Sequence, residues 1–130
     1  MNDANAMKVL IVDDSSVMRK IVERALRQAG LESMEVFEAG SGVEGLEVLR
    51  VESVALILSD INMPSMDGLE FLRQIRLKQL AVGVPVVMIT TESSEEHVRQ
   101  AIVSGAQGYI RKPFTADQVK ERVLPLIMLA

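Results

Sequence analysis

The chain has 130 residues, of which 48% are hydrophobic, and this length and composition predict one compact domain over residues 1–130, with only residues 1–6 flexible. The net charge of −4 argues against binding to nucleic acid, and the absence of cysteine excludes disulfides, thiolate zinc sites and iron–sulfur clusters. No aliphatic stretch approaches the roughly 20 residues of a membrane span and no signal peptide is recognisable, so we expect a soluble, cytoplasmic protein without membrane contact.

Apolar patterning predicts five strands that alternate with helices. The strands are expected at residues 8–12, 34–39, 54–59, 85–90 and 108–110, the second being weaker because it contains Glu35 and Glu38. Helices are expected over residues 17–29, 41–50, 67–75, 93–105 and from 115 onward, each beginning at a Ser, Thr or Asp cap. The first should bury an apolar stripe from Val17 through Ile21 to Ala29, the fourth should bury Ile102, and Pro125 should kink or end the last.

Continuous apolar strands alternating with helices indicate an α/β domain whose parallel sheet is covered on both faces. In such folds the loops that bind ligands gather at the carboxyl ends of the strands. Asp13, Asp14, Asp60 and Thr90 stand at those ends, and Lys112 follows the last strand. Their joint placement is more informative than any one of them, since a single such residue is usually a cap, a turn residue or a solvated side chain.

Three carboxylates at one edge of a sheet repel one another unless a cation lies among them. Mg²⁺ suits such a site, because it accepts carboxylates, a carbonyl and waters and leaves a position for a phosphate oxygen. A nearby lysine and hydroxyl would then supply the charge and the hydrogen bond that a transferring phosphoryl group needs. One of the aspartates would be the nucleophile.

The order of four motifs also resembles the receiver domains of two-component response regulators. The motifs are Asp13-Asp14 and the segments 60–68 (DINMPSMDG), 89–92 (ITTE) and 108–114 (GYIRKPF), which together span nearly the whole chain. Within that family the pattern is most similar to the stand-alone chemotaxis regulators. The resemblance implies a five-stranded parallel sheet with the flavodoxin-like strand order 2-1-3-4-5 and helices on both faces.

The resemblance also implies roles for the acidic residues and the lysine. Asp60 would be the phosphoacceptor and Lys112 the cation that pairs with the phosphoryl oxygens. Mg²⁺ would be held by Asp14, by Asp60 and by the main-chain carbonyl of Asn62. Asp13 would act on the same ion through a bound water.

Further residues would control the signal and its lifetime. Thr90 and Tyr109 would form a switch that responds to phosphorylation, and Asn62 and Glu92 would tune dephosphorylation. The implied partners are a histidine kinase and an output protein bound at the face of the fourth helix, fifth strand and fifth helix. The protein would thus be a signalling switch that catalyses only its own phosphorylation and dephosphorylation, as a monomer or a phosphorylation-dependent dimer.

Other interpretations compete with this one. Residues 40–45 (GSGVEG) fit the G-x-G-x-x-G pattern of a dinucleotide-binding enzyme, with Asp60 near the place of a ribose-binding acid, but this interpretation leaves Lys112 unexplained. A phosphatase with a D-x-D motif is disfavoured, because Asn62 replaces the second acid. A receiver-like scaffold could bind its partner without phosphorylation. The apolar tail, residues 126–129, either covers its own sheet or packs on a partner or a second copy.

Overall fold

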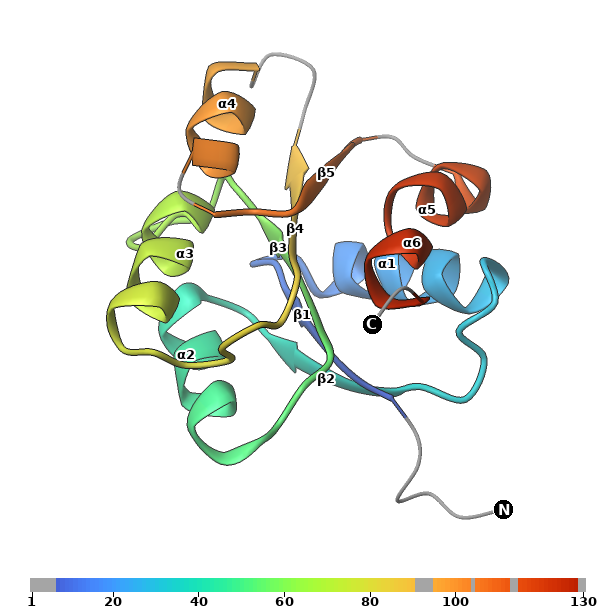
Figure 1. Ribbon diagram of the computed structural model, residues 1–130, viewed down its shortest axis with the longest axis horizontal. Helices are drawn as coiled ribbons and strands as arrows, with labels where there is room; N and C mark the ends of the chain where they lie inside the picture. Colours follow the sequence, from blue (N-terminus) through green and yellow to red (C-terminus); the bar gives the residue numbers. More distant parts are fainter. Residues whose placement is uncertain (1–6, 91–94, 104, 113–114, 129–130) are drawn as a thin grey trace.

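The computed structural model describes residues 7–90, 95–103, 105–112 and 115–128, and it contains a five-stranded parallel sheet between two layers of helices (Figure 1). The strands lie side by side in the order β2-β1-β3-β4-β5. Their bounds are β1 Lys8–Val12, β2 Glu35–Ala39, β3 Leu56–Asp60, β4 Val86–Thr90 and β5 Gly108–Arg111. The predicted fold class and strand order are therefore confirmed.

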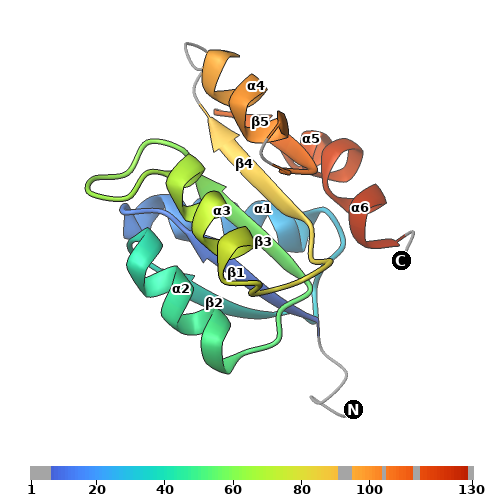
Figure 2. The same ribbon diagram turned by 60° about the vertical axis from the view of Figure 1, so that its left-hand side comes forward.

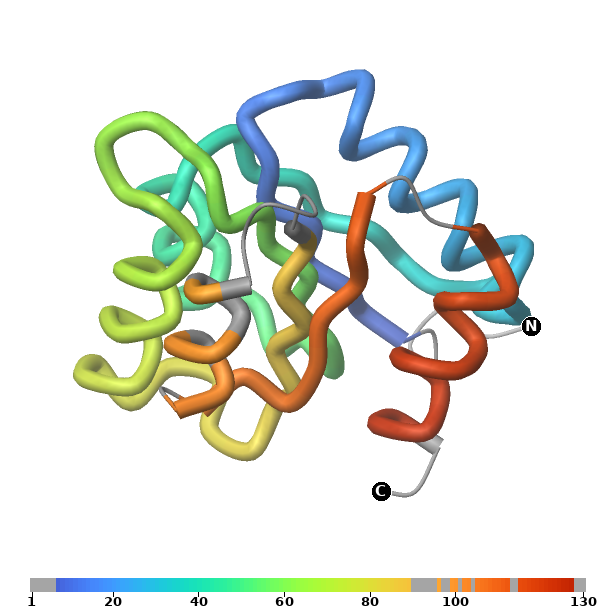
Figure 3. Tube along the Cα trace, turned by 90° about the horizontal axis from the view of Figure 1, so that it is seen from above, coloured from blue at the N-terminus to red at the C-terminus, as the bar shows by residue number. Residues whose placement is uncertain are grey.

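The helices cover both faces of this sheet. Their bounds are α1 Ser16–Gln28, α2 Gly42–Val51, α3 Gly68–Leu77, α4 Glu95–Val103, α5 Ala116–Arg122 and α6 Leu124–Met128. Helices α2 and α3 lie on one face and α1, α5 and α6 on the other, while α4 lies beside α3 near β4 (Figure 2). The view from above shows the same two layers flanking the strands (Figure 3).

Side-chain caps begin four of the helices as the sequence predicts. The hydroxyls of Ser15, Ser41 and Thr115 and the carboxylate of Asp67 each accept a hydrogen bond from the main-chain N–H three residues further along. These bonds satisfy donors that have no partner within a helix, and each such cap typically contributes about 1 kcal/mol. The caps therefore fix where these four helices begin.

A separate apolar cluster fills the space on each side of the sheet. All five residues of β3 are buried, which explains why the strand begins with three consecutive apolar residues rather than an alternating pattern. Phe71, Leu72 and Ile75 of α3 pack on one face, and Val22, Ala25 and Leu26 of α1 pack on the other. Each fully buried aliphatic or aromatic side chain contributes about 1.5–3 kcal/mol, so the two clusters hold the strand ends in place.

The buried faces predicted for two helices are wrong at single residues, although Val22, Ala25 and Leu26 of α1 and Ala29 at its end are buried as expected. In α1, Val17 and Ile21 are 69% and 47% exposed, because the face toward the sheet is centred on Val22, one residue and about 100° further around the helix than Ile21. In α4, Ile102 is 53% exposed, since this helix packs beside α3 and β4 and leaves its outer face uncovered. The other α4 residues expected inward, 98 and 101, have side chains outside the described structure.

Several element boundaries differ from the sequence prediction by one or two residues. Strand β3 begins two residues later than expected and ends at Asp60, which pairs with Ile89 of β4 and so belongs to the strand. The single helix predicted from residue 115 onward is two helices in the structure. The first, α5, ends at Arg122, and α6 has Pro125 in its first turn, where a missing N–H costs little.

The two tail residues whose side chains are described cover the chain's own sheet. Leu126 and Ile127 are partly buried against the cluster formed with α1 and α5, and Leu126 also approaches Gly108 of β5. These contacts support the first of the two interpretations for residues 126 and 127, while the side chain of residue 128 and all of residue 129 lie outside the described structure. Over the part of the chain that the structure describes, no helix is both long enough and apolar enough to cross a membrane.

Candidate functional site

Three aspartates meet where β1 and β3 end. Asp13 directly follows β1 and Asp60 is the last residue of β3, and these strands are paired neighbours, with Val12 opposite Ser59. One carboxylate oxygen from each of Asp13, Asp14 and Asp60 lies within 4.8 Å of the other two. Asp13 and Asp60 are only 1% and 5% exposed, whereas Asp14 faces solvent. The sheet therefore brings together the acids that the sequence analysis selected.

Lys112 completes this cluster from the far side of β4. It follows β5, and its Nζ lies 3.4 Å from Oδ2 of Asp13 and 3.4 Å from Oδ2 of Asp60. Its side chain is 21% exposed, so the ammonium is partly shielded from water. One lysine thus bridges the two buried carboxylates, which is the placement that the sequence analysis expects of a cation serving the site.

The remaining oxygens of the two buried acids bind main-chain N–H groups. The N–H of Ser15 donates to Oδ1 of Asp13 at 2.9 Å, and the N–H of Asn62 donates to Oδ1 of Asp60 at 3.4 Å. Each buried carboxylate therefore turns one oxygen toward the backbone and the other toward Lys112. This double anchoring fixes the orientation of both groups.

The electrostatic balance of the cluster is incomplete. Burial raises the pKa of Asp60 above its usual range and the nearby charge of Asp13 adds to this effect, while Lys112 only partly opposes them. With all three acids ionised, the cluster has two negative charges that Lys112 does not balance. A divalent cation would balance them. The donor set fits the chemistry of Mg²⁺, which prefers carboxylate and carbonyl oxygens and keeps several waters.

Gly68 allows helix α3 to start directly against the phosphoacceptor candidate. Its N–H donates to the carbonyl of Ile61 at 2.8 Å. A Cβ at this position would overlap the main-chain oxygen of Asp60 and the Cα of Ile61, and neither backbone atom can move aside. Glycine is therefore required by packing here, which explains the Asp67-Gly68 pair at the end of the second motif.

The predicted switch residues lie on the two strands beyond β3. Thr90 is the last residue of β4 and pairs in register with Arg111, but its side chain is outside the described structure. Tyr109 lies on β5, is half-buried, and has the guanidinium of Arg122 at 5.3 Å from its ring centroid. Of the two residues expected to tune dephosphorylation, Asn62 follows β3 beside Asp60, and Glu92 lies outside the described residues.

The glycine motif at residues 40–45 serves packing within the protein. A Cβ on Gly42 would lie 2.6 Å from Sδ of Met66, and one on Gly45 would lie 2.8 Å from Cζ of Phe71. The N–H of Gly40 donates to the carboxylate of Glu44 at 2.9 Å. The close approach that these glycines permit is thus to the chain's own side chains, which disfavours the dinucleotide-binding interpretation.

One residue in contact with the site was not found by sequence reasoning. The guanidinium of Arg19 donates to the main-chain carbonyl of Asp13 and, at 2.8 Å, to Oε1 of Glu38. The available signal was Glu38 itself, a charged residue in a predicted strand next to the acidic loop. Its partner could not be named without knowing that β2 pairs with β1.

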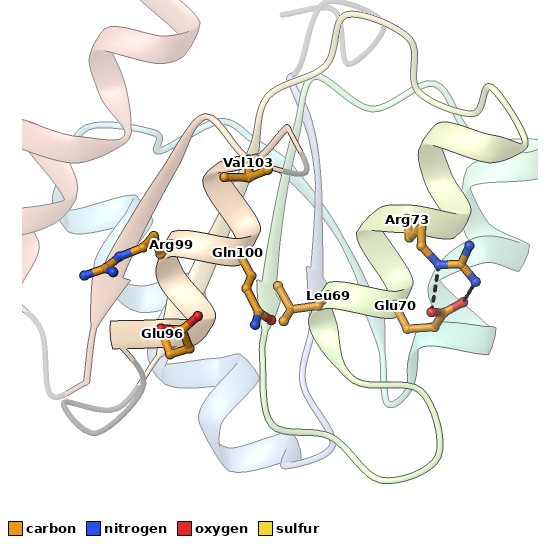
Figure 4. A pocket seen from close by; sticks show the side chains of 7 residues that line it. All are labelled: Leu69, Glu70, Arg73, Glu96, Arg99, Gln100 and Val103. Atoms are coloured by element: carbon orange, nitrogen blue, oxygen red, sulfur yellow. Dashed lines mark hydrogen bonds and ion pairs between the residues drawn. The ribbon is translucent and has the colours of Figure 1, made fainter.

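A separate surface groove lies between α3 and α4, away from the acids. Leu69 and Val103 provide apolar surface, and Glu70 pairs with Arg73 at 2.9 Å on one side (Figure 4). None of the acid-cluster residues lines it. The groove is therefore distinct from the candidate site.

Comparisons with known proteins agree with this geometry. A family model for the response regulator receiver domain matches residues 9–124. A chemotaxis protein CheY homolog from Campylobacter jejuni is 40% identical over 118 residues, which cover 90% of this chain and 89% of that protein.

Solved structures show the same fold. Chemotaxis protein CheY4 from Vibrio cholerae superposes with a TM-score of 0.80 at 35% identity, covering 94% of this chain and 98% of that one. A response regulator receiver domain protein from Clostridium thermocellum superposes with a TM-score of 0.81 at 27% identity, covering 95% of each chain. With its acid cluster, its strand order and this family match over most of its length, the chain belongs to the response regulator receiver domain family.

Proposed function

We propose that this protein is a phosphorylation-dependent switch in which Asp60 accepts a phosphoryl group from the phosphohistidine of a histidine kinase. The observation that carries the proposal is the placement of Lys112, whose Nζ lies 3.4 Å from both Asp13 and Asp60 within a cluster of three acids. A buried carboxylate flanked by a cation and by two further acids is suited to phosphoryl chemistry, which depends mostly on positioning and electrostatics.

In the proposed transfer, a carboxylate oxygen of Asp60 forms a bond to phosphorus as the phosphorus–nitrogen bond of the kinase histidine breaks. The leaving imidazole takes the electron pair of that bond. Bound Mg²⁺, held by Asp14, Asp60 and the Asn62 carbonyl with Asp13 acting through water, would supply the positive charge that the cluster lacks. Lys112 would move its ammonium from the acids to the new phosphoryl oxygens.

The proposed signal ends when water attacks the phosphoryl group and releases inorganic phosphate and free Asp60. Asn62 and Glu92 would tune this step by controlling how water approaches, and the protein would act on no other substrate. The output surface would comprise α4, β5 and α5, with Thr90 and Tyr109 as the switch. Because the similar proteins from C. jejuni and V. cholerae are named for chemotaxis, we propose a chemotactic output.

Titration with Mg²⁺ and then with beryllofluoride, a mimic of the phosphoryl group, tests the proposal. Amide NMR signals of Asp13, Asp60 and Asn62 should shift with Mg²⁺ and shift again with beryllofluoride. Asp60→Asn should abolish the second response, and Lys112→Met should weaken it. Signals around Asp60 that ignore both additions would show the proposal to be wrong.

Partner binding separates this switch from a receiver-like scaffold. For a switch, beryllofluoride should raise the affinity for an output protein, and Asp60→Asn should prevent that increase. For a scaffold, the variant should bind its partner as tightly as the wild-type protein with beryllofluoride. Sedimentation of the two forms tests at the same time whether activation produces a dimer.

A further inference from the structure

Arg19 holds the main chain beside the acid cluster from outside. Its Nη1 donates to the main-chain carbonyl of Asp13, and its Nε donates to Oε1 of Glu38 at 2.8 Å. Asp13 follows β1, whereas Glu38 lies on β2, the neighbouring edge strand, opposite Ile11. The Arg19 side chain is only 16% exposed, so little water competes for these bonds. The guanidinium therefore ties the loop after β1 to the edge of the sheet.

Asp14 depends on this loop more than the other two acids do. It is exposed, and over the described residues its carboxylate forms no hydrogen bond or ion pair. By contrast, the carboxylate of Asp13 is held by the N–H of Ser15 and by Lys112. The orientation of Asp14 toward the cluster thus comes from its backbone rather than from partners of its side chain.

The carbonyl that Arg19 binds belongs to the peptide unit that joins Asp13 to Asp14. Because a peptide unit is planar, fixing its oxygen also fixes the direction in which the chain enters Asp14. The two bonds of the Arg19 fork are set by the rigid geometry of the guanidinium, and the second of them is anchored on a charged group. A change at Arg19 should therefore rotate the Asp14 carboxylate relative to Asp13 and Asp60.

We propose that Arg19 is a positioning residue for the metal site, orienting the Asp13–Asp14 peptide so that Asp14 faces the other acids, and that Glu38 in turn orients Arg19. This inference rests on the Mg²⁺ site of the proposed function. Side chains that orient metal ligands without touching the metal typically change its affinity by 10- to 100-fold when they are mutated.

Lys20 provides a matched control. Its Nζ lies 2.8 Å from the other carboxylate oxygen of Glu38, the same distance as Nε of Arg19 from its own oxygen. Over the described residues it contacts no member of the acid cluster and is 67% exposed. Loss of Lys20 therefore removes an equal bond to Glu38 while leaving the Asp13 carbonyl held.

The test measures the Mg²⁺ dissociation constant from amide NMR signals for the wild type, for the single variants Arg19→Met, Arg19→Lys, Glu38→Gln and Lys20→Met, and for the double variant Arg19→Met/Glu38→Gln. Arg19→Met should weaken Mg²⁺ binding by about 10-fold. Arg19→Lys should weaken it as well, since one ammonium cannot reproduce the fork. Lys20→Met should stay within about twofold of the wild type. The double variant Arg19→Met/Glu38→Gln should match Arg19→Met alone if Glu38 acts through Arg19.

Unfolding of each variant in Mg²⁺-free buffer gives the second readout. A merely structural role would lower the midpoint for Arg19→Met and leave the Mg²⁺ dissociation constant of the folded protein unchanged. That result would overturn the inference. So would tighter Mg²⁺ binding by Arg19→Met, or a loss of Mg²⁺ affinity in Lys20→Met equal to that in Arg19→Met. If the wild type itself fails to bind Mg²⁺, the proposed function is wrong and this inference with it, and that single titration distinguishes the two failures.

Discussion

Two clusters of charged side chains lie next to each other near the ends of β1 and β2. Acids outnumber cations in the first, and cations outnumber acids in the second. In the acid cluster, which contains three carboxylates, Lys112 pairs with two of them, Asp13 and Asp60. In the second cluster, Glu38 alone receives bonds from Arg19 and Lys20, each at 2.8 Å. The first is deeply buried at two of its acids, and the second lies partly in solvent.

The two clusters shift the pKa values of their acids in opposite directions. Burial and the charge of Asp13 raise the pKa of Asp60, whereas hydrogen bonds from Lys20 and then Arg19 lower the pKa of Glu38. Ionised Asp60 therefore opposes folding until a ligand arrives, and ionised Glu38 favours folding on its own. A buried cluster with excess negative charge thus indicates a ligand site, while an acid held by two cations beside it indicates a support.

The largest expected effect is a difference in how Mg²⁺ changes stability. At 100 times its dissociation constant, Mg²⁺ should raise the free energy of unfolding of the wild type by about 2.7 kcal/mol. Asp14→Asn should lose most of this gain, because it replaces a charged carboxylate of the proposed Mg²⁺ site with a neutral amide. Lys20→Met should keep the full gain. Urea unfolding with and without Mg²⁺ measures each gain. Similar gains in all three proteins would contradict the distinction between the clusters.

Neutralising one acid from each cluster should change stability in opposite directions. In Mg²⁺-free buffer at pH 7, Asp60→Asn should raise the free energy of unfolding by on the order of 1 kcal/mol, because it removes a disfavoured buried charge. Glu38→Gln should lower it by roughly 0.5 kcal/mol, since its ion pairs are partly screened by solvent. Urea unfolding again provides the measurement, and effects of the same sign would refute the comparison.

The pH dependence of these two differences follows from the pKa directions. The pKa of Asp60 in the folded protein lies above its ordinary value of 3.8, so wild-type stability falls, and the advantage of Asp60→Asn grows, as pH rises from that value through the raised pKa. The pKa of Glu38 lies below its ordinary value of 4.5, so its contribution is complete above that value and is lost as pH falls through the lowered pKa. Both differences should therefore shrink in acid.

The acid cluster could be predicted from sequence because its members stand where apolar runs stop. The apolar residues 8–12 form a strand, and parallel strands place their carboxyl ends together on one side of the sheet. The residue at which β3 ends was harder to predict. Asp60 was expected after its strand but belongs to it, because pairing with Ile89 extends β3 to that residue. A strand end is set by its neighbours as well as by its own composition.

The second cluster and the buried helix faces could not be predicted in the same way. Periodicity shows that α1 has an apolar stripe, but it does not say which edge of the stripe meets the sheet, so it predicts Val17 and Ile21 inward although both are exposed. The contact of Arg19 with Asp13 and Glu38 requires three segments to meet, and no local pattern encodes that meeting. Long-range packing therefore decides which polar residues support the site.

A third charged contact differs from both clusters because its cation faces a ring. Arg122 of α5 lies over Tyr109, with the guanidinium 5.3 Å from the ring centroid. Over the described residues, no acid pairs with Arg122, so this contact is the interaction that orders its side chain. Such contacts at exposed sites contribute about 0.5–1 kcal/mol. The chain has 1 tyrosine and no tryptophan, so its intrinsic fluorescence reports on this ring alone.

The smallest expected effect is therefore that of Arg122→Gln, which should lower the free energy of unfolding by about 0.5 kcal/mol. Because Tyr109 is half-buried beneath that guanidinium, the variant should also make its fluorescence more accessible to a neutral quencher such as acrylamide. Lys120→Gln is the matched control, since it removes the same charge from an exposed position on α5 without a ring contact. If both variants change quenching and stability equally, net charge is responsible and Arg122 does not cover the ring.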